Sequence, residues 1–590
     1  MNRSTSSSPR NASSAGTRVN HRTAEEEAKG TNQDLHDIDE SRMNMEEVRC
    51  WYKNAVFYGL DVSTFQDSNG DGVGDFPGLC RRLDYLADLG VTCIWLLPFF
   101  PSPDRDNGYD VMDYYSVDPK FGTFEDFLVF VRGAGERGLR VMIDLVMDHT
   151  SDRHPWFQAA RRDRQSRYRR YYVWTDAPPP SEPGKKNIFP GEESSVWTYD
   201  EVAGQYYYHQ FYHFEPDLDV GNPDVREEIK RVIDYWLSFG VSALRVDAVS
   251  HMIEPHQALQ PVTSHDPHYI LRELRNYTSS RRADCALLGE ADVEPDELRR
   301  FFGDGDEMHL LYNFLLNNFL FLAFATGQAE PLQRCLRLLP AIPENSEWMN
   351  FLRNLDELDL ERLSDQEREA VYRSFAPDQG MRIFGRGIRR RLAPMLGDRR
   401  RLESAFSLLF SLPGAPLFIY GDELGMGEDL SLEGRDAVRI PMQWSCERHA
   451  GFSTAPREAL PAPVISAGPF NYQAVNVADQ ATDPDSLLSW MKRLIALRRQ
   501  CPEWGWGSCH VVQVGEPGLF AHSTEWKGRR LLAVHNLADK TAVARLDREP
   551  DTRLIPLFSS RPVPDHSDHL KLELEPYGYR WYRLETNLSH

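Results

Sequence analysis

Three acidic residues each lie where a short apolar run typical of a β-strand ends. They are Asp247 in SALRVDAV, Glu290 in CALLGEADV and Asp356 in FLRNLDELDL. In a parallel α/β barrel, the carboxyl ends of the strands form the mouth at which chemistry takes place. Two carboxylates at such a mouth can cleave a glycosidic bond, and a third can bind the sugar. The sequence therefore predicts a glycoside-cleaving site built from these three residues.

Neighbouring residues give two of these acids different surroundings. Arg245 lies two residues before Asp247, so the two side chains point to the same face of a strand. A nearby guanidinium favours the ionised carboxylate that a nucleophile needs. Glu290 follows the apolar run LLG, and dry surroundings raise the pKa of a carboxylic acid, as acid catalysis requires. One such acid alone is more often a solvated loop residue or a helix cap, but three at strand ends together favour catalysis.

Apolar runs and amphipathic segments alternate from Trp51 onward, a pattern typical of parallel strands joined by helices. The strand-like runs are NAVFYGLDV, VTCIWLLP, LRVMIDLVMDH, SALRVDAV, DCALLGEA, EMHLLYNF, EWMNFLRN and APLFIYGDE. They predict an α/β protein with a closed (β/α)8 TIM barrel, an inserted subdomain after strand three and a C-terminal antiparallel β domain. The expected parts are a disordered tail (1–47), the catalytic barrel (48–148 and 219–500), the inserted subdomain (149–218) and the C-terminal β domain (505–590).

Composition restricts the classes of partner. The chain has 590 residues, a formal net charge of −22 and an isoelectric point near 5.3. Nucleic acids and anionic membranes are bound by basic patches, so this acidity argues against both. The sequence contains no run of 18 apolar residues, the least that a membrane-spanning helix needs. These features favour a protein that acts on a small molecule, and they leave open whether it forms a homo-oligomer.

Cysteine usage and the N-terminus indicate a cytoplasmic protein. The eight cysteines form no CxxC pair and no zinc-binding spacing, and two of them, Cys93 and Cys285, lie inside apolar runs. Buried thiols of this kind are typical of a reducing compartment. The first residues, MNRSTSSSPRNASSAG, lack the apolar core of a signal peptide.

Several stretches together resemble the α-amylase superfamily, glycoside hydrolase family thirteen. The matching motifs are DLVMDH (144–149), ALRVDAV (243–249), LLGEA (287–291) and RNLDE (353–357). The resemblance extends from about Trp51 to the end of the chain. It is closest to members of that family that interconvert maltose and trehalose, through stretches such as WYKNAVFYGLDVSTFQDSNGDGVGDFPGL, YGDELGMGEDL and GRDAVRIPMQW.

The resemblance implies a role for each residue of the matching motifs. Asp247 would be the nucleophile and Glu290 the acid/base. Asp356 would bind the ring hydroxyls and stabilise the oxocarbenium-like transition state, and Arg245 would hold Asp247. Tyr109, Asp110 and His149 would line the subsite for the cleaved glucose, with the Tyr109 ring stacked on the sugar. Without the resemblance, His149 would be read as a loop histidine and Tyr109 as a core aromatic.

The loop DSNGDGVGD after the first strand has the character of a calcium site. Oxygen-bearing side chains alternate with residues that allow a tight turn, which suits a hard cation. The Glu expected at the twelfth position of an EF-hand is Gly78, so the loop is not an EF-hand. The resemblance implies a structural Ca²⁺ and no organic cofactor; its ligands would be Asp67, Asn69, Asp71, the Val73 carbonyl and Asp75. The alternative is an Asx/Gly turn without an ion.

Four positions depart from the family pattern. Leu355 stands where the family has a histidine that bonds the sugar hydroxyls, and Asp148 replaces the asparagine before His149. Glu215 and Asp219 in EPDLD replace amides of the related stretch QPDLN. Loss of one hydrogen bond made in the transition state costs roughly 2.7–4 kcal/mol, so an apolar residue facing the sugar predicts a slower or altered enzyme.

The resemblance implies a retaining enzyme whose substrate is a disaccharide. It would interconvert maltose and trehalose by intramolecular transfer of an α-glucosyl group. One alternative is an α-glucosidase or another transglucosylase that acts on maltose or sucrose. Another, from a different class, is a weakly active or non-catalytic glucan-binding partner protein. The presence of all three acids favours an active enzyme.

Overall fold

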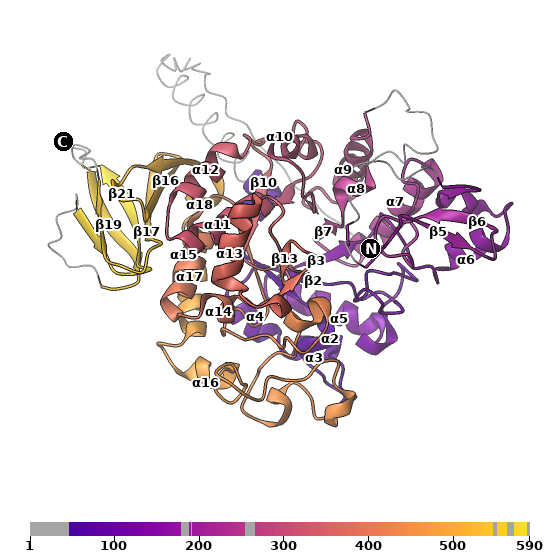
Figure 1. Ribbon diagram of the computed structural model, residues 1–590, viewed down its shortest axis with the longest axis horizontal. Coiled ribbons are helices and arrows are strands. Elements are labelled where there is room, and N and C mark those ends of the chain that lie inside the picture. Colours follow the sequence, from indigo (N-terminus) through magenta and orange to yellow (C-terminus); the bar gives the residue numbers. More distant parts are fainter. Residues whose placement is uncertain are drawn as a thin grey trace, which may run out of the picture. The chain divides into compact units, whose positions relative to one another are not determined.

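The computed structural model describes residues 46–178, 188–189, 192–253, 266–546, 552–562 and 571–586. Its centre is a closed barrel of parallel strands in the order β1-β14-β10-β9-β8-β7-β3-β2, so that strands consecutive in the chain are also neighbours. Figure 1 shows β2, β3, β7 and β10 of this barrel in the middle of the ribbon. Each strand coincides with one of the predicted apolar runs, which confirms the (β/α)8 barrel. The strands are β1 Phe57–Leu60, β2 Cys93–Leu96, β3 Arg140–Leu145, β7 Ala243–Val246, β8 Ala286–Gly289, β9 Leu310–Tyr312, β10 Glu347–Phe351 and β14 Ala415–Ile419.

The register between strands brings two of the predicted acids together. Asp144 on β3 pairs with Arg245 on β7, and Val246 on β7 pairs with Gly289 on β8. The residues that follow this last pair are Asp247 and Glu290, so both lie at the carboxyl end of the barrel on neighbouring strands. All four residues of β7 and of β8 are buried, because in a closed parallel barrel one face meets the interior and the other the helices.

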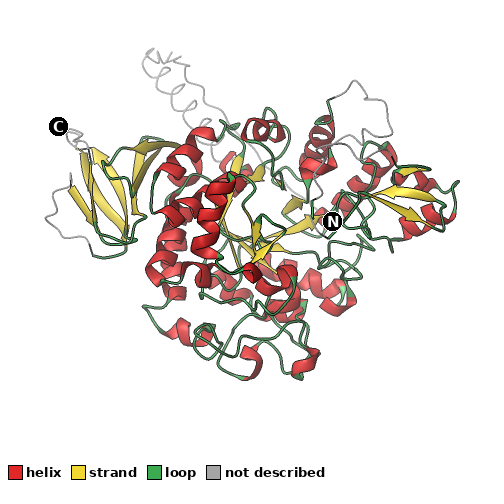
Figure 2. Ribbon diagram, in the orientation of Figure 1, coloured by secondary structure: helices red, strands yellow, loops and turns green. Residues whose placement is uncertain are grey.

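Helices surround the strands (Figure 2). The helix α7 is a typical example: Asn222 caps its first turn, Pro223 starts it, and the stripe from Val225 to Trp236 is buried at helical spacing. Thr123 and Asp126 form a capping box at the start of α5. The barrel helices are α3 Phe76–Arg81, α4 Leu83–Leu89, α5 Phe124–Glu136, α7 Pro223–Ser238, α9 Tyr269–Arg281, α11 Phe314–Thr326, α12 Glu330–Leu338, α15 Arg399–Ser411 and α17 Leu487–Gln500.

Shorter elements occupy the loops of the barrel. Three two-residue strands after β10 form a small sheet in the order β11-β13-β12. The elements are α2 Val62–Phe65, α8 Val249–Met252, α10 Pro295–Leu298, β11 Leu358–Asp359, α13 Asp365–Phe375, β12 Arg382–Ile383, β13 Gly387–Ile388, α14 Leu392–Leu396, α16 Val477–Thr482 and α18 Glu503–Trp506.

Between β3 and β7 the chain leaves the barrel and forms an antiparallel sheet in the order β4-β6-β5. Isolated bridges of Asp217 with His149 and of Leu218 with Tyr172 join the last residues of this excursion to earlier ones. An insertion after strand three is therefore present, as predicted. Its elements are α6 Pro155–Arg162, β4 Trp174–Thr175, β5 Trp197–Asp200 and β6 Gln205–Tyr208.

The last part of the chain is antiparallel, as predicted, with a five-stranded sheet in the order β15-β16-β17-β21-β19 and a β18-β20 pair. The predicted domain limits stay predictions, and residues 1–45 of the expected disordered tail lie outside the described residues. Among the described residues, no helix has the length and apolar character to cross a membrane. The strands are β15 Ser508–Val512, β16 Leu519–Trp526, β17 Arg529–Asn536, β18 Ala542–Arg545, β19 Thr552–Ser559, β20 Lys571–Leu574 and β21 Tyr579–Thr586.

Candidate active site

Arg245 is the centre of the candidate site. It is 1% exposed, and its two terminal nitrogens hold three carboxylates. Nη1 donates to Asp144 Oδ1 and to Asp247 Oδ1, each at 2.6 Å, and Nη2 donates to Glu290 Oε2 at 2.6 Å. Asp144 is fixed in turn by Trp95, whose Nε1 donates to Oδ2 at 3.0 Å. The predicted pairing of Arg245 with Asp247 is therefore present, and the same guanidinium also donates a hydrogen bond to Glu290.

Asp356 lies in the loop after β10 and is held by two arginines from a distant part of the chain. Arg439 Nη2 donates to Asp356 Oδ1 at 2.8 Å, and Arg435 Nη1 lies 3.3 Å from the same oxygen. Burial alone would raise the pKa of Asp356, but Arg435 and Arg439 outweigh it and hold this pKa below its ordinary value. Asp356 is therefore an ionised group at neutral pH.

The protonation of Glu290 is the opposite of that of Asp356. Burial raises its pKa to about 8, against the stabilising charge of Arg245 and with a further contribution from Asp247. Glu290 therefore carries a proton at neutral pH. A carboxylic acid that keeps its proton at neutral pH is what glycosidases use for acid catalysis.

The three acids, together with Tyr109, His149 and Arg245, line one cavity of about 270 Å³. The structure thus brings together six of the seven residues that the sequence assigned to catalysis and substrate binding. Tyr109 is 5% exposed, and its hydroxyl accepts a hydrogen bond from Arg245 Nη1 at 3.2 Å. The roles of these residues stay predictions, but their convergence on one cavity is a property of the fold.

The seventh residue, Asp110, lies behind the cavity wall. It is fully buried, and its carboxylate accepts hydrogen bonds from Ser102 Oγ at 2.6 Å and from Arg105 Nε at 3.2 Å. Arg105 also donates to Ser151 Oγ at 3.1 Å and forms an ion pair with Asp152. The Asp110 carboxylate is therefore occupied by Ser102 and Arg105, and Asp110 is not among the residues that line the cavity.

Leu355 also does not face the cavity, although its neighbours Asn354 and Asp356 line it. Its side chain is fully buried, and its backbone has φ of 76°, a left-handed conformation that is rare for such a residue. Arg439 Nε donates to its carbonyl at 3.0 Å. We expected Leu355 to leave sugar hydroxyls unpaired, but the structure turns the side chain away from the space in which a sugar would lie.

Sequence reasoning alone did not single out several residues of the site. Arg435 and Asp106 line the cavity, and Phe211 contributes an aromatic ring beside His149, with ring centroids 5.2 Å apart. Arg439 lies behind them. The available signal was GRDAVRIPMQW, which places two arginines four residues apart within a matching motif, but nothing in its spacing connects it to Asp356.

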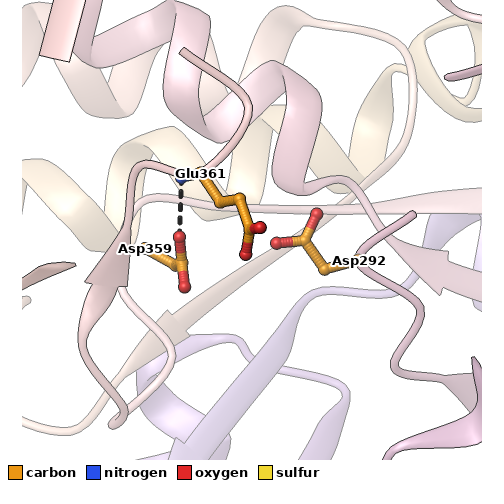
Figure 3. A group of neighbouring side chains, drawn as sticks. All are labelled: Asp292, Asp359 and Glu361. Carbon is orange, nitrogen blue, oxygen red and sulfur yellow. Dashed lines mark hydrogen bonds between the residues drawn. The ribbon is translucent and has the colours of Figure 1, made fainter. Parts of the chain in front are cut away.

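The far end of the cavity is lined by three acids and two arginines. Asp292, Asp359 and Glu361 have carboxylate oxygens within 4.8 Å of one another (Figure 3). Arg362 Nε lies 2.9 Å from Asp292 Oδ1, and Arg386 Nε donates to Asp359 Oδ2 at 2.7 Å. The two guanidiniums neutralise most of this charge, so we regard the group as a polar surface for hydroxyls rather than as a metal site.

The predicted calcium loop is a chain of Asx turns. Asp67, Asn69 and Asp71 each accept the backbone N–H two residues further on, at 3.0, 2.8 and 2.8 Å. Asp75 accepts the Gly78 N–H at 2.6 Å and so caps α3. Asn69 and Asp71 keep lone pairs after these bonds, whereas the Asp67 carboxylate also accepts from Gly70 N, Gly72 N and Ser453 Oγ. The donors are of the kind that a hard cation binds, and Asp67 would have to exchange a hydrogen bond for the ion.

The chain matches the model of the α-amylase catalytic domain over residues 62–507 and that of a sucrose hydrolase-like C-terminal domain over residues 528–583. It therefore belongs to the α-amylase family. The trehalose synthase of Pimelobacter sp. is 40% identical over 555 residues, which are 90% of this chain and 96% of the relative. The trehalose synthase/amylase TreS of Mycobacterium tuberculosis is 39% identical over 554 residues, 91% of each chain. Similarity of this extent groups the chain with the trehalose synthases.

Two further comparisons describe length and fold. The trehalose synthase of Thermus thermophilus is 43% identical over 540 residues, and the chain spans only 56% of that relative. Among solved structures, the trehalulose synthase MutB of Pseudomonas mesoacidophila MX-45 is 27% identical, with a TM-score of 0.72 over 91% of this chain and 99% of that one. The fold of this chain thus also occurs in an enzyme named trehalulose synthase.

Proposed function

We propose that the protein interconverts maltose and trehalose by a retaining, intramolecular transfer of an α-glucosyl group. The observation that carries this proposal is the Arg245 cluster, in which one guanidinium holds Asp247 and Glu290 on neighbouring strands of a cavity large enough for a sugar. Retaining enzymes need two carboxylates at a short separation. The similarity to trehalose synthases supports the choice of substrate.

Glu290 and Asp356 have the charges that their steps of the proposed reaction require. Glu290 donates its proton to the glycosidic oxygen, the bond from this oxygen to C1 breaks, and Asp247 forms a bond to C1. The ionised Asp356 stabilises the positive charge that develops on the glucosyl ring. Glu290 then takes the proton of the anomeric hydroxyl of the released glucose, which attacks C1 and frees Asp247.

Between the two steps, the released glucose must turn without leaving. The acids and arginines at the far end of the cavity offer hydrogen-bond acceptors and donors for its hydroxyls in more than one orientation. Exclusion of water from the cavity then decides between isomerisation and hydrolysis. We therefore assign the polar group of Asp292, Asp359, Glu361, Arg362 and Arg386 to the acceptor glucose.

Purified protein incubated with maltose in the presence of ¹³C-glucose is expected to form unlabelled trehalose. Label stays out of the product because the glucose that attacks is the one released from the same molecule. Chromatography with mass spectrometry separates and identifies the products. Glucose as the sole product would show a hydrolase, and labelled trehalose would show an intermolecular transferase; either result contradicts the proposal.

We also propose that the loop from Asp67 to Asp75 binds a structural Ca²⁺ through Asp67, Asn69, Asp71, the Val73 carbonyl and Asp75. An ion at a concentration 100-fold above its Kd would stabilise the fold by about 2.7 kcal/mol. Chelation is therefore expected to lower Tm by about 2–4 °C or less, given the size of the barrel. Calorimetry with Ca²⁺ and with chelator measures this, and the Asp71→Ala variant, altered at an exposed residue, should lose the difference. Equal Tm values in the unaltered protein would exclude the ion.

The cytoplasm is the proposed location. All eight cysteines are free. Cys93 and Cys285 are buried, and the others range from buried to exposed. Free thiols in this number are typical of proteins kept in a reducing compartment.

A further inference from the structure

A histidine in the cavity wall lies between two buried carboxylates. His149 is 2% exposed; its Nδ1 is 3.7 Å from Asp148 Oδ2, and its Nε2 is 3.9 Å from Glu215 Oε1. These separations are those of ion pairs and are too long for hydrogen bonds. Both acids stand where the family pattern has amides, so this chain has added two carboxylates on opposite sides of one imidazole.

All four facing atoms are buried and have no hydrogen-bond partner among the described residues. Asp148 is 2% exposed and Glu215 is fully buried. A carboxylate removed from water and left without a counter-charge is strongly unfavourable. A positively charged imidazolium between the two carboxylates compensates both, whereas a neutral imidazole compensates neither.

Backbone hydrogen bonds bring the segments of these three residues together. Leu218 N donates to Asp148 O at 2.7 Å, and Thr150 N donates to Pro216 O at 3.2 Å. The hydroxyl of Tyr114 donates to His149 O at 2.9 Å. The segment that carries Glu215 is therefore paired with the segment that carries Asp148 and His149.

Other acids surround the same ring. Asp247, after β7, and Asp106, in the loop after β2, both interact electrostatically with His149. Burial alone would lower the pKa of His149, but Glu215 and Asp148 outweigh it and raise this pKa to about 10. Burial also raises the pKa of Glu215. The charge of His149 opposes this rise, as in an ion pair between an imidazolium and a carboxylate.

We propose that Glu215 and Asp148 are positioning residues that keep His149 as a buried imidazolium and thereby fix its ring in the wall of the glucosyl subsite. Both ring nitrogens are directed at the two carboxylates rather than at the cavity. His149 therefore shapes the subsite by its fixed ring rather than by an N–H bond to the sugar. Its effect on the substrate rests on the proposed function, but its protonation does not.

The first test measures protonation in the ligand-free protein. NMR of protein labelled at histidine Cε1, with His149→Gln to identify the signal, is expected to show no titration of His149 between pH 6 and 9. In Glu215→Gln the midpoint should move down into this range, and in the Asp148→Asn/Glu215→Gln protein it should move further toward the ordinary value near 6.5. Titration of His149 near 6.5 in the unaltered protein, or the same titration in all three, would overturn the proposal.

The second test measures binding without turnover. Glu290→Gln removes both the reaction and the titration of Glu290 itself, so that the affinity for maltose is read by calorimetry from pH 6 to 9. Asp144 and Asp292, whose pKa values burial raises to about 7, still titrate in this range, so the Kd is compared at each pH with and without the Glu215→Gln change. The added Glu215→Gln change should weaken binding about tenfold at pH 9 and less at pH 6. The loss of affinity for maltose grows with pH because, with Glu215→Gln, the His149 ring loses its proton in this range and is no longer held by charge.

Asp219→Asn is the matched control. It removes a carboxylate from the same stretch, but that carboxylate lies beside Gly221, and the change should leave both the titration and the binding unaltered. If the Glu215→Gln protein binds maltose as before although its His149 titration has moved, the positioning role is overturned. If the Glu290→Gln protein does not bind maltose at all, the proposed function fails, and the titration still decides the charge of His149.

Discussion

Asp247→Ala is expected to lower kcat for maltose by on the order of 10⁴-fold or more, because it removes the carboxylate that bonds to C1. Azide should restore turnover of α-glucosyl fluoride by attacking from the vacated side, and the product should be the β-glucosyl azide. In Glu290→Ala the glucosyl-enzyme still forms from the fluoride, and azide then attacks from the opposite side to give the α-glucosyl azide. NMR of the products distinguishes the two anomers.

The pair of products assigns the two roles independently of the rate. The same anomer from both variants, or the two anomers exchanged, would contradict the assignment of Asp247 as nucleophile and Glu290 as acid/base. Asp144→Asn is a useful control. Asp144 contacts the same guanidinium but does not line the cavity, so this variant should keep retaining chemistry without azide.

Arg245→Met is expected to lower the free energy of unfolding by about 3–5 kcal/mol and to abolish activity, because the three carboxyl groups around it lose the positive charge that pairs with their ionised forms. The pKa of Asp144 is already raised to about 7 by burial with Arg245 in place, and it would rise further without it. The folded variant then binds more protons than the unfolded chain, so its stability falls as pH rises. Denaturant unfolding at pH 5 and pH 8 should show a larger loss at pH 8.

A buried arginine elsewhere provides the comparison. Arg498 is 2% exposed, and it donates to the backbone carbonyls of Phe410 and Gly414 rather than to carboxylates. Arg498→Met should destabilise the protein with less dependence on pH. If Arg245→Met instead loses the same stability at both pH values, Arg245 contributes packing rather than charge.

The barrel was predictable because each strand carries its own signal. A parallel strand is buried on both faces and so reads as an apolar run, and the helix between two strands reads as an amphipathic segment. Asp247 and Glu290 follow their runs directly, and Arg245 is two residues from Asp247. Such relations lie within a few residues, where sequence spacing and three-dimensional position are closely linked.

The partners of Asp356 were not predictable in this way. Arg435 and Arg439 come from a segment about 80 residues further along, and no local pattern reports a contact over that distance. Asp110 and Leu355 were not predictable for a more local reason: Arg105, five residues before Asp110, binds its carboxylate, and a left-handed backbone turns the Leu355 side chain away from the cavity. Asp356, Asp110 and Leu355 were all singled out from the sequence, but the orientation of each side chain depends on residues that contact it in the folded structure.

The amino-acid sequence by itself predicted the class of fold and placed three acids at strand ends, because these depend on residue type and short-range spacing. The kind of reaction was predicted from the resemblance to a family. Only the tertiary structure decided the charges. Glu290 keeps its proton because burial outweighs Arg245, and Asp356 loses its proton because two distant arginines outweigh burial. His149 keeps its proton because the last residues of the inserted segment place Glu215 beside it. Desolvation and charge pairing act through space, so they exist only once the chain has folded.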